Sequence, residues 1–325
     1  MNKGTIISII IFLVFTISIP FAAFLFNDED IDIIPKTNKT SGVVFDVYLP
    51  DTQEVKTYTA EEYLFGVVAG EMDITFEEEA LKAQTVAAYS LALYRKEKRE
   101  KSPDESIMNA DVTADSRIDQ AFLTKEQVKE KWGSNYEQYS KKLEGIISSV
   151  QGKYLTYKGE IAQTVYHDTS SGKTETAENM WGSAIEYLVS VQSVGDILSP
   201  QYLTKISVPN DEFVRLLSEN EVEISANKLK TEIEIASRTE SGTVLSVKFG
   251  EKSLKGTKIR EIFNLRSANF DISFADNKVE FTVRGYGHGV GMSQYGANEM
   301  AKQGSSFEDI LKWYYKGCEI SQKTL

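Results

Sequence analysis

Residues that build covalent cross-links and metal centres are almost absent from this 325-residue chain. Cys318 is the only cysteine, so no disulfide can form within the chain. His167 and His288 are the only histidines, too few with one cysteine to complete a closed His/Cys zinc site. We therefore expect no disulfide and no metal, and we interpret Cys318 as a small buried apolar residue.

Positive charge is also scarce. The chain has 36 Lys and Arg against 48 Asp and Glu, a net charge of −12, and no long basic run. Because proteins bind nucleic acid largely by neutralising phosphates, this balance argues against a nucleic-acid partner. Hydrophobic residues at 41% and charged residues at 26% are typical of a globular protein, and the length suggests about two domain-sized units.

One uncharged stretch, Thr5 to Phe26, is long enough to cross a bilayer as a helix. Lys3 precedes it and acidic residues follow, so we expect the N-terminus to stay in the cytoplasm. A cleavable signal peptide is the alternative, but the apolar run is long for one and no small-x-small site follows. We predict an uncleaved anchor (1–26), a linker (27–42) and a domain (43–325) that works outside the cytoplasm, where nucleotide cofactors are scarce; we expect no cofactor.

Capping residues and hydrophobic periodicity predict an α+β fold. Three capping boxes predict helices, the second ending near Lys101 and the third near Val150: Thr59 with Glu62, Thr75 with Glu78, and Thr124 with Gln127. The other expected elements are a strand at 43–49, a hairpin at 154–166 turned at Lys158-Gly159, a helix near 211–217, a strand at 279–284, and helices near 293–302 and 307–315. Residues 200–276 contain several β-like runs, and we consider them a candidate for a smaller β-rich lobe.

Glu71 is the first candidate for chemistry. Leu64, Val67, Val68 and Glu71 are spaced i, i+3, i+4 and i+7, which places the carboxyl group on an apolar helix stripe. Burial of a carboxyl group raises its pKa toward the range of a general acid. The alternative is a structural carboxylate that pairs with a neighbour or reaches water at the helix end, and spacing alone leaves both open.

Two further segments carry polar residues suited to a ligand. Residues 167–175 are dense in short polar side chains, as expected for a surface that binds a polyol, and a His167-Asp168-Ser triad is rejected because neighbours in sequence rarely have triad geometry. Residues 285–296 hold four glycines within seven residues but match neither the dinucleotide pattern nor a P-loop. We interpret this glycine loop as a wall against which a bulky ligand lies, although a tight turn with a structural histidine is the alternative.

Several sequence blocks resemble the stage II sporulation protein D family. They are Tyr63-Leu64-x-Gly66-Val67-Val68-Ala69-x-Glu71-Met72, Glu79-Ala80-Leu81-Lys82-Ala83-Gln84-x-Val86-Ala87-Ala88, Ser170-Ser171-Gly172-x-Thr174-Glu175 with Trp181-Gly182 and Tyr187-Leu188, and Gly287-His288-Gly289-Val290-Gly291-Met292-Ser293-Gln294-x-Gly296-Ala297. The blocks keep the family's order over roughly residues 43 to 320. The chain departs from the family's usual pattern at Tyr89-Ser90, Val189 and Asp73, where Arg-Thr, a basic residue and proline are common.

The resemblance implies a membrane-anchored lytic transglycosylase that cuts peptidoglycan during engulfment of the forespore, at the engulfing septal membrane. It implies that Glu71 is the catalytic acid in a glycan cleft. The expected substrate-binding residues are Gln84, Tyr89, Ser170, Ser171, Tyr187, His288, Gln294 and Tyr295. The implied substrate is a glycan strand stripped of stem peptides, cut between N-acetylmuramic acid and N-acetylglucosamine to leave 1,6-anhydro ends.

The implied partners are the sporulation amidase, stage II sporulation protein P, and a membrane protein, stage II sporulation protein M. Two other functions remain as alternatives. One is a glycan-binding scaffold with weak or no catalysis, and the other is a hydrolase that uses a second carboxylate and water.

Overall fold

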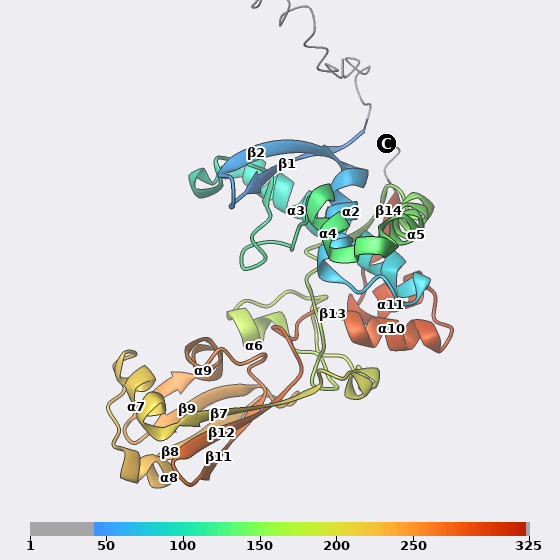
Figure 1. Ribbon diagram of the computed structural model, residues 1–325. Coiled ribbons are helices and arrows are strands. Elements are labelled where there is room, and N and C mark those ends of the chain that lie inside the picture. Colours follow the sequence, from blue (N-terminus) through green and yellow to red (C-terminus); the bar gives the residue numbers. More distant parts are fainter. Residues whose placement is uncertain (1–41, 323–325) are drawn as a thin grey trace, which may run out of the picture. The chain divides into compact units, whose positions relative to one another are not determined.

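The computed structural model describes residues 42–322 (Figure 1). The predicted anchor and nearly all of the predicted linker lie outside these residues. Between residues 42 and 322, no helix combines the length and the apolar character needed to span a bilayer. The described residues mix helices with several small sheets, which confirms the predicted α+β class.

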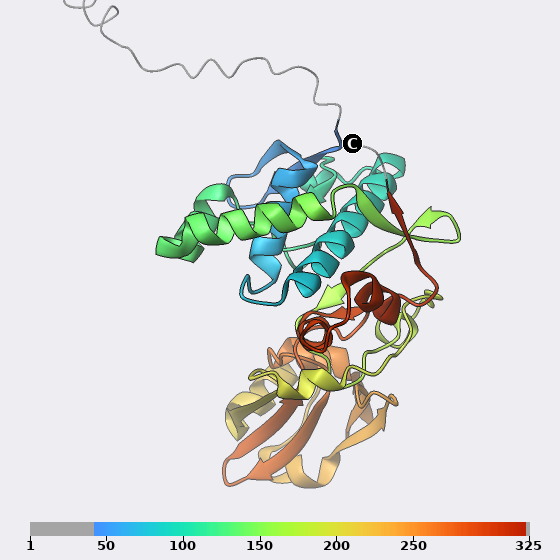
Figure 2. The ribbon, with the colours of Figure 1, turned by 90° about the vertical axis from the view of Figure 1, so that its right-hand side faces the viewer.

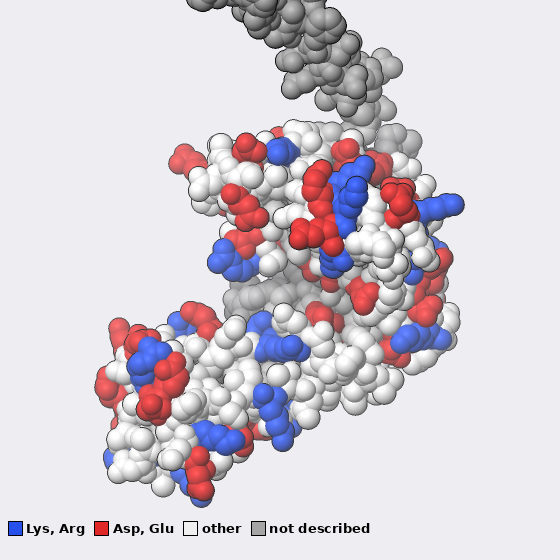
Figure 3. Space-filling model, viewed as in Figure 1, with Lys and Arg blue, Asp and Glu red and all other residues white. Residues whose placement is uncertain are grey.

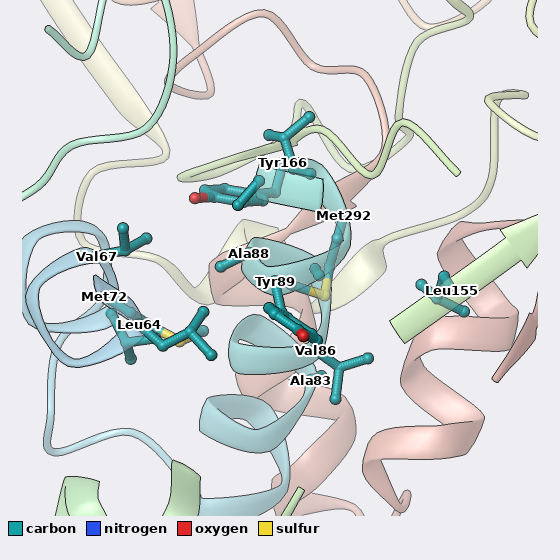
Figure 4. Close-up of a cluster of buried hydrophobic side chains, with 14 of the residues drawn as sticks. Leu64, Val67, Met72, Ala83, Val86, Ala88, Tyr89, Leu155, Tyr166 and Met292 are labelled. Atoms are coloured by element: carbon teal, nitrogen blue, oxygen red, sulfur yellow. The ribbon is translucent and has the colours of Figure 1, made fainter. Parts of the chain in front are cut away.

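The N-terminal half places two helices beside a small sheet. The sheet has the order β2-β1-β3, with β1 antiparallel to β2 and parallel to β3. The bounds are β1 (Val44–Leu49), β2 (Glu54–Thr59), α2 (Ala60–Glu71), α3 (Glu78–Lys101) and β3 (Val112–Thr113), with a short 3-10 turn at Glu105–Ile107. Apolar side chains of α2 and α3 meet in the main hydrophobic core, among them Leu64 and Val67 of α2 and Ala88 of α3 (Figure 4).

Two of the three predicted capping boxes are confirmed. Thr59 caps α2 together with Glu62, and Thr124 caps α4 (Lys125–Trp132) together with Gln127. The third prediction is wrong, because Thr75 instead binds the Asp73 carboxylate (N to Oδ1, 2.9 Å) and α3 begins without a side-chain cap.

The third helix is also not continuous as predicted. Gly133 ends α4 with a positive φ of 51°, a 3-10 turn follows at Gly133–Asn135, and α5 covers Tyr136–Ser149. Glycine adopts this left-handed region without the steric penalty of other residues. The break therefore comes from a backbone conformation that periodicity does not reveal.

The predicted hairpin forms but is shorter than expected. β4 (Lys153–Tyr157) and β5 (Glu160–Ile161) are joined through Lys158 and Gly159, both with positive φ as in a type I′ turn. β14 (Glu319–Gln322) pairs with the other edge of β4. The extension to Tyr166 is wrong: β6 (Tyr166–His167) instead pairs in parallel with β13 (Met292–Ser293).

Residues 203–284 contain two three-stranded antiparallel sheets, of order β10-β9-β8 and β11-β12-β7. The elements are β7 (Leu203–Pro209), α7 (Asn210–Ser218), a 3-10 turn at Ala226–Lys228, α8 (Leu229–Glu232), β8 (Ile233–Arg238), β9 (Val244–Phe249), β10 (Lys252–Lys255), α9 (Gly256–Ile262), β11 (Phe270–Ala275) and β12 (Lys278–Arg284). They form a yellow-to-orange region in Figure 2 with its own hydrophobic cluster, in which the Phe213 and Phe263 rings stack at 4.6 Å. The helix predicted near 211–217 and the strand at 279–284 are confirmed.

The remaining elements are α6 (Ala177–Trp181), a 3-10 segment at Val194–Leu198, α10 (Gln294–Lys302) and α11 (Phe307–Tyr314). Both predicted C-terminal helices are therefore confirmed. They pack on α3, and Cys318 is buried next to them in the main core, as expected.

Candidate active site

Glu71 is the last residue of α2, and its side chain is partly buried. Its Oε1 accepts a hydrogen bond of 2.6 Å from the Ala121 N–H. Burial raises the pKa of Glu71 from 4.5 to about 7, although the Ala121 bond, the nearby Gln294 amide and the Lys131 charge each lower it. The carboxyl group is thus half-protonated near neutral pH, and the pKa is shifted in the direction expected for an acid on an apolar helix stripe.

Two glycines on α2 bring Ala121 to this carboxyl group. A side chain at Gly66 would overlap Phe122 and the Leu123 carbonyl, and one at Gly70 would press on Ala121. The loop therefore lies directly against the helix, where the Leu123 N–H also donates to the Gly66 carbonyl (3.2 Å). Only helix positions without a Cβ permit this approach.

Glu71 lines a cavity of about 580 Å³, within the usual range for small-ligand sites. Figure 3 shows the drawn face hollowed near α6, with Lys and Arg side chains at the margins. The lining comes from segments far apart in sequence. Its polar and aromatic members include Glu71, Arg95, Arg117, Asp119, Gln120, Gln163, Tyr166, His167, Asp168, Trp181, Arg260, Tyr286, His288 and Gln294.

Gln294 is held at the cavity by the start of α10. Ser293 caps this helix, accepting from the Gly296 N–H (3.2 Å), and β13 pairing sets Ser293 opposite His167. The Gln294 side chain is 5% exposed, and its Nε2 has no hydrogen-bond partner within residues 42–322. The same amide lies beside Glu71 and lowers its pKa, so its donor can serve either the Glu71 carboxylate or an acceptor on a ligand.

Both histidines line the cavity in neutral form. Burial lowers the pKa of His167 to about 3 and of His288 to about 4, and the Arg260 charge lowers both further. His167 Nδ1 lies 3.1 Å from the Val290 carbonyl and must donate to it, which leaves Nε2 as an acceptor without a partner among the described residues. His288 Nδ1 accepts from the Val290 N–H (3.1 Å), so its Nε2 carries the proton. The Tyr166 carbonyl is a hydrogen-bond partner of the His288 ring, so the free group of this pair is the His167 Nε2 acceptor.

Two aromatic rings in the lining remain open to solvent. Trp181 is 44% exposed and its ring lies 5.5 Å from that of His288; Tyr286 is 41% exposed. The Arg266 guanidinium packs 5.1 Å from the Tyr286 ring. Exposed aromatic faces in a cavity are suited to stacking on sugar rings. The sequence analysis did not select either residue, although Trp181 belongs to one of the matched blocks.

The four glycines at positions 285, 287, 289 and 291 serve the protein's own packing. All have positive φ, and a side chain at Gly291 would overlap the Val165 carbonyl, while one at Gly287 would press on His167. The interpretation that these glycines clear room for a ligand is therefore wrong at these two positions. They clear room for the β6 segment, and this close approach brings His167 and His288 together, with ring centroids 5.7 Å apart.

Glu71, His288 and Gln294 are the predicted site residues that meet in the cavity; several others do not line it. Gln84 and Tyr89 are buried on α3, with the Tyr89 ring edge-on to Phe45. Tyr187 is buried and accepts from the Gln163 N–H (2.6 Å). Tyr295 donates to the Leu198 carbonyl (3.0 Å).

Ser170 and Ser171 line a separate small pocket that His288 also borders. Ser170 donates its N–H to Asp196 Oδ2 (2.9 Å), and the Ser171 hydroxyl donates to the Ser241 carbonyl (2.9 Å). Asp196 also accepts from the Ser293 hydroxyl (2.6 Å), so this buried carboxylate ties the serine loop to the start of α10. Burial raises the pKa of Asp196 to about 6. Sequence reasoning did not select it, because no periodicity marks a buried acid in a short 3-10 segment.

Two more carboxylates line the cavity. Asp119 forms ion pairs with Arg95 (3.1 Å) and Arg99 (2.5 Å), whereas Asp168 Oδ1 accepts the Thr169 hydroxyl (2.5 Å). Among residues 42–322, no arginine forms an ion pair with Asp168. In residues 42–322, no group of three or more His, Cys, Asp or Glu side chains is arranged to hold a metal ion.

Comparison with known proteins agrees with the sequence blocks. The family model described as "Stage II sporulation protein" matches residues 48–157. Stage II sporulation protein D of Bacillus subtilis is 38% identical over 289 residues, covering 88% of this chain and 81% of the relative. The protein of the same name from Bacillus amyloliquefaciens is 40% identical over 286 residues, with coverages of 88% and 81%. The amidase enhancer of Bacillus subtilis is 26% identical over 307 residues, covering 79% of this chain and 40% of that protein. The chain belongs to the stage II sporulation protein D family.

Proposed function

We propose that this protein is a lytic transglycosylase that uses Glu71 to cut peptidoglycan glycan strands during sporulation. The observation that carries the proposal is a carboxyl group in a large cavity whose pKa burial raises to about 7. An acid that also serves as a base works best when its pKa lies near the working pH. Membership of the stage II sporulation protein D family supports the part of the proposal that places this activity in sporulation.

The proposed reaction has two proton transfers. Protonated Glu71 donates to the oxygen between N-acetylmuramic acid and N-acetylglucosamine, and the bond from muramyl C1 to that oxygen breaks. The Glu71 carboxylate then removes the proton of the muramyl C6 hydroxyl as its oxygen bonds to C1. The products are a free N-acetylglucosamine end and a 1,6-anhydro ring; no water is consumed and Glu71 ends protonated.

The rest of the cavity suits a neutral sugar. Trp181 and Tyr286 offer ring faces, and the Gln294 amide offers a donor close to Glu71. His167 Nε2 offers an acceptor. Hydrogen-bonding groups already held in place spend little free energy on reorganisation during the reaction.

Hydrolysis is the second candidate, and Asp168 is the observation that favours it. A carboxylate without an arginine partner in the same cavity is a candidate base for activating water. In the deciding experiment, peptide-free strands are digested with the full-length chain and the masses of the new muramyl ends are measured by mass spectrometry. An anhydro end is one water lighter than a reducing end.

We expect anhydro ends that vanish with Glu71→Gln and persist with Asp168→Asn. Reducing ends that vanish with both variants establish a hydrolase instead. Strand binding that produces no new ends leaves the glycan-binding scaffold.

We further propose that residues 1–26 anchor the chain in the membrane with the domain outside the cytoplasm. The uncharged stretch and its charged flanks support this orientation. Protease added to intact protoplasts should remove the domain; a protected domain refutes the orientation.

We also propose two protein partners, stage II sporulation protein P, which is an amidase, and stage II sporulation protein M. The likeness to a protein named for enhancing an amidase supports the amidase partner. Co-purification from sporulating cells tests both partners.

A further inference from the structure

Three arginines line the cavity, and two of them are already paired. Arg95 contacts Asp119 at 3.1 Å, and Arg117 contacts Asp115 at 2.6 Å. Arg260 differs from both. Within the described part of the chain it forms no ion pair, and its guanidinium makes a single hydrogen bond, from Nε to the Leu265 carbonyl (3.2 Å). Its two terminal nitrogens therefore keep their donors for another partner.

The position of Arg260 is fixed by close packing of α9. A side chain at Gly256, the first residue of α9, would overlap the Val244 carbonyl, so the helix lies directly on β9. Ile259 is fully buried beneath it. The neighbouring Arg260 borders the cavity that also contains Glu71. The packed helix fixes the Arg260 backbone, and the Nε bond to the Leu265 carbonyl orients its guanidinium.

An unpaired, partly buried guanidinium is energetically unfavourable, and the burial lowers the pKa of Arg260. Within residues 42–322 no carboxylate forms an ion pair with it. The histidines beside it are neutral, and Glu71 is half-protonated near pH 7. Asp168 lines the same cavity, but its hydrogen bond there is to the Thr169 hydroxyl and not to Arg260. The planar guanidinium matches a carboxylate, which accepts two parallel hydrogen bonds from it. The cavity thus has a place for an anionic group on an otherwise neutral ligand.

Muramyl sugars carry such a group in one chemical state only. Their lactyl carboxyl is an uncharged amide while a stem peptide is attached, and it becomes a free carboxylate when an amidase hydrolyses that bond. We propose that Arg260 forms a carboxylate subsite that binds the free lactyl group of a peptide-free muramyl residue. The inference rests on the proposed function. It makes Arg260 the residue that orders the two reactions, with amide hydrolysis before glycan cleavage.

Binding measurements test the subsite separately from catalysis. The full-length chain carrying Glu71→Gln is titrated with peptide-free strands, and with the same strands after carbodiimide coupling of methylamine to the lactyl carboxylates. We expect the free-carboxylate strands to bind about 10- to 100-fold more tightly, the range of a hydrogen-bonded charge pair. Adding Arg260→Gln should remove that preference by weakening only the charged strands. Arg260→Lys should restore part of it.

Arg215→Gln is the matched control. Arg215 is an exposed arginine in the same β-rich region, paired with Glu212 (2.6 Å), and its loss should leave both affinities unchanged. If the Glu71→Gln chain with Arg260 intact binds the two strands equally, the subsite is overturned. That comparison needs no substitution at Arg260. Cleavage is assayed separately with the wild-type chain. If the wild-type chain cuts neither strand while the Glu71→Gln chain still prefers the charged strand, the subsite is supported and the proposed function is refuted.

Discussion

Glu71→Gln changes one property of the site above all others. Glutamine keeps the shape of the side chain and an oxygen that accepts from the Ala121 N–H, but it cannot ionise. The substitution therefore removes both the transferable proton and the cost of a buried charge. General acid–base catalysis contributes about 10²- to 10⁴-fold, so strand cleavage should fall by that factor.

The effect on stability has the opposite sign and depends on pH. The pKa of Glu71 is 4.5 in its ordinary state and about 7 in the folded protein. Protonation therefore stabilises the fold; this contribution is complete below 4.5 and is lost as the pH rises through 7. The shift corresponds to up to about 3 kcal/mol, at 1.36 kcal/mol for each pKa unit. At high pH the glutamine variant should be the more stable protein by that amount.

Urea unfolding of the wild-type and variant chains at about pH 5 and pH 8 tests this expectation. The difference in unfolding free energy should grow in favour of the variant by about 2 to 3 kcal/mol between these values. Other titrating groups, Asp196 among them, contribute equally to the pH dependence of both chains, so their contributions cancel in the difference. A difference that does not change with pH, or a variant that cleaves strands at the wild-type rate, refutes the assignment of Glu71 as the buried acid.

Three other substitutions, two of them with a matched control, test the framework and the binding surface of the site. Gly291→Ala should lower the unfolding free energy by more than about 2 kcal/mol through overlap with a carbonyl oxygen; Gly304→Ala, also at positive φ but in open space, should cost only about 1 kcal/mol. Asp196→Asn should cost about 1 to 3 kcal/mol, because its amide meets an N–H donor; an unchanged melting temperature contradicts this. Trp181→Ala should weaken strand binding up to about tenfold, whereas Trp313→Ala, outside the cavity lining, should leave binding unchanged.

Local sequence signals predicted local structure well. The caps at Thr59 and Thr124 were found because their hydrogen bonds reach only three residues along the chain. Thr75 has the same spacing, but its N–H binds Asp73 instead, and the pattern contains no information about that competition. The parallel pairing of Tyr166 with Met292 joins segments 126 residues apart, and no local pattern encodes it.

The candidate site shows the same division. Glu71 was visible because an acid on an apolar stripe is a local anomaly, and His288 and Gln294 because glycines surround them. Arg260 carries no such mark: it is an ordinary basic residue on a short helix, and its distinction is the lack of an acidic neighbour in the described structure. That property exists only after the chain has folded.

The cause of the raised Glu71 pKa bears on how many carboxylates the reaction needs. In paired-carboxylate sites a neighbouring negative charge raises the pKa, so the second group is part of the acid's behaviour. Here burial is the largest cause, and no carboxylate is among the others. Asp119, in the same cavity, is neutralised by Arg95 and Arg99. A single buried acid therefore has the pKa that both proton transfers require, which supports the one-carboxylate mechanism and leaves Asp168→Asn as the substitution that separates it from hydrolysis.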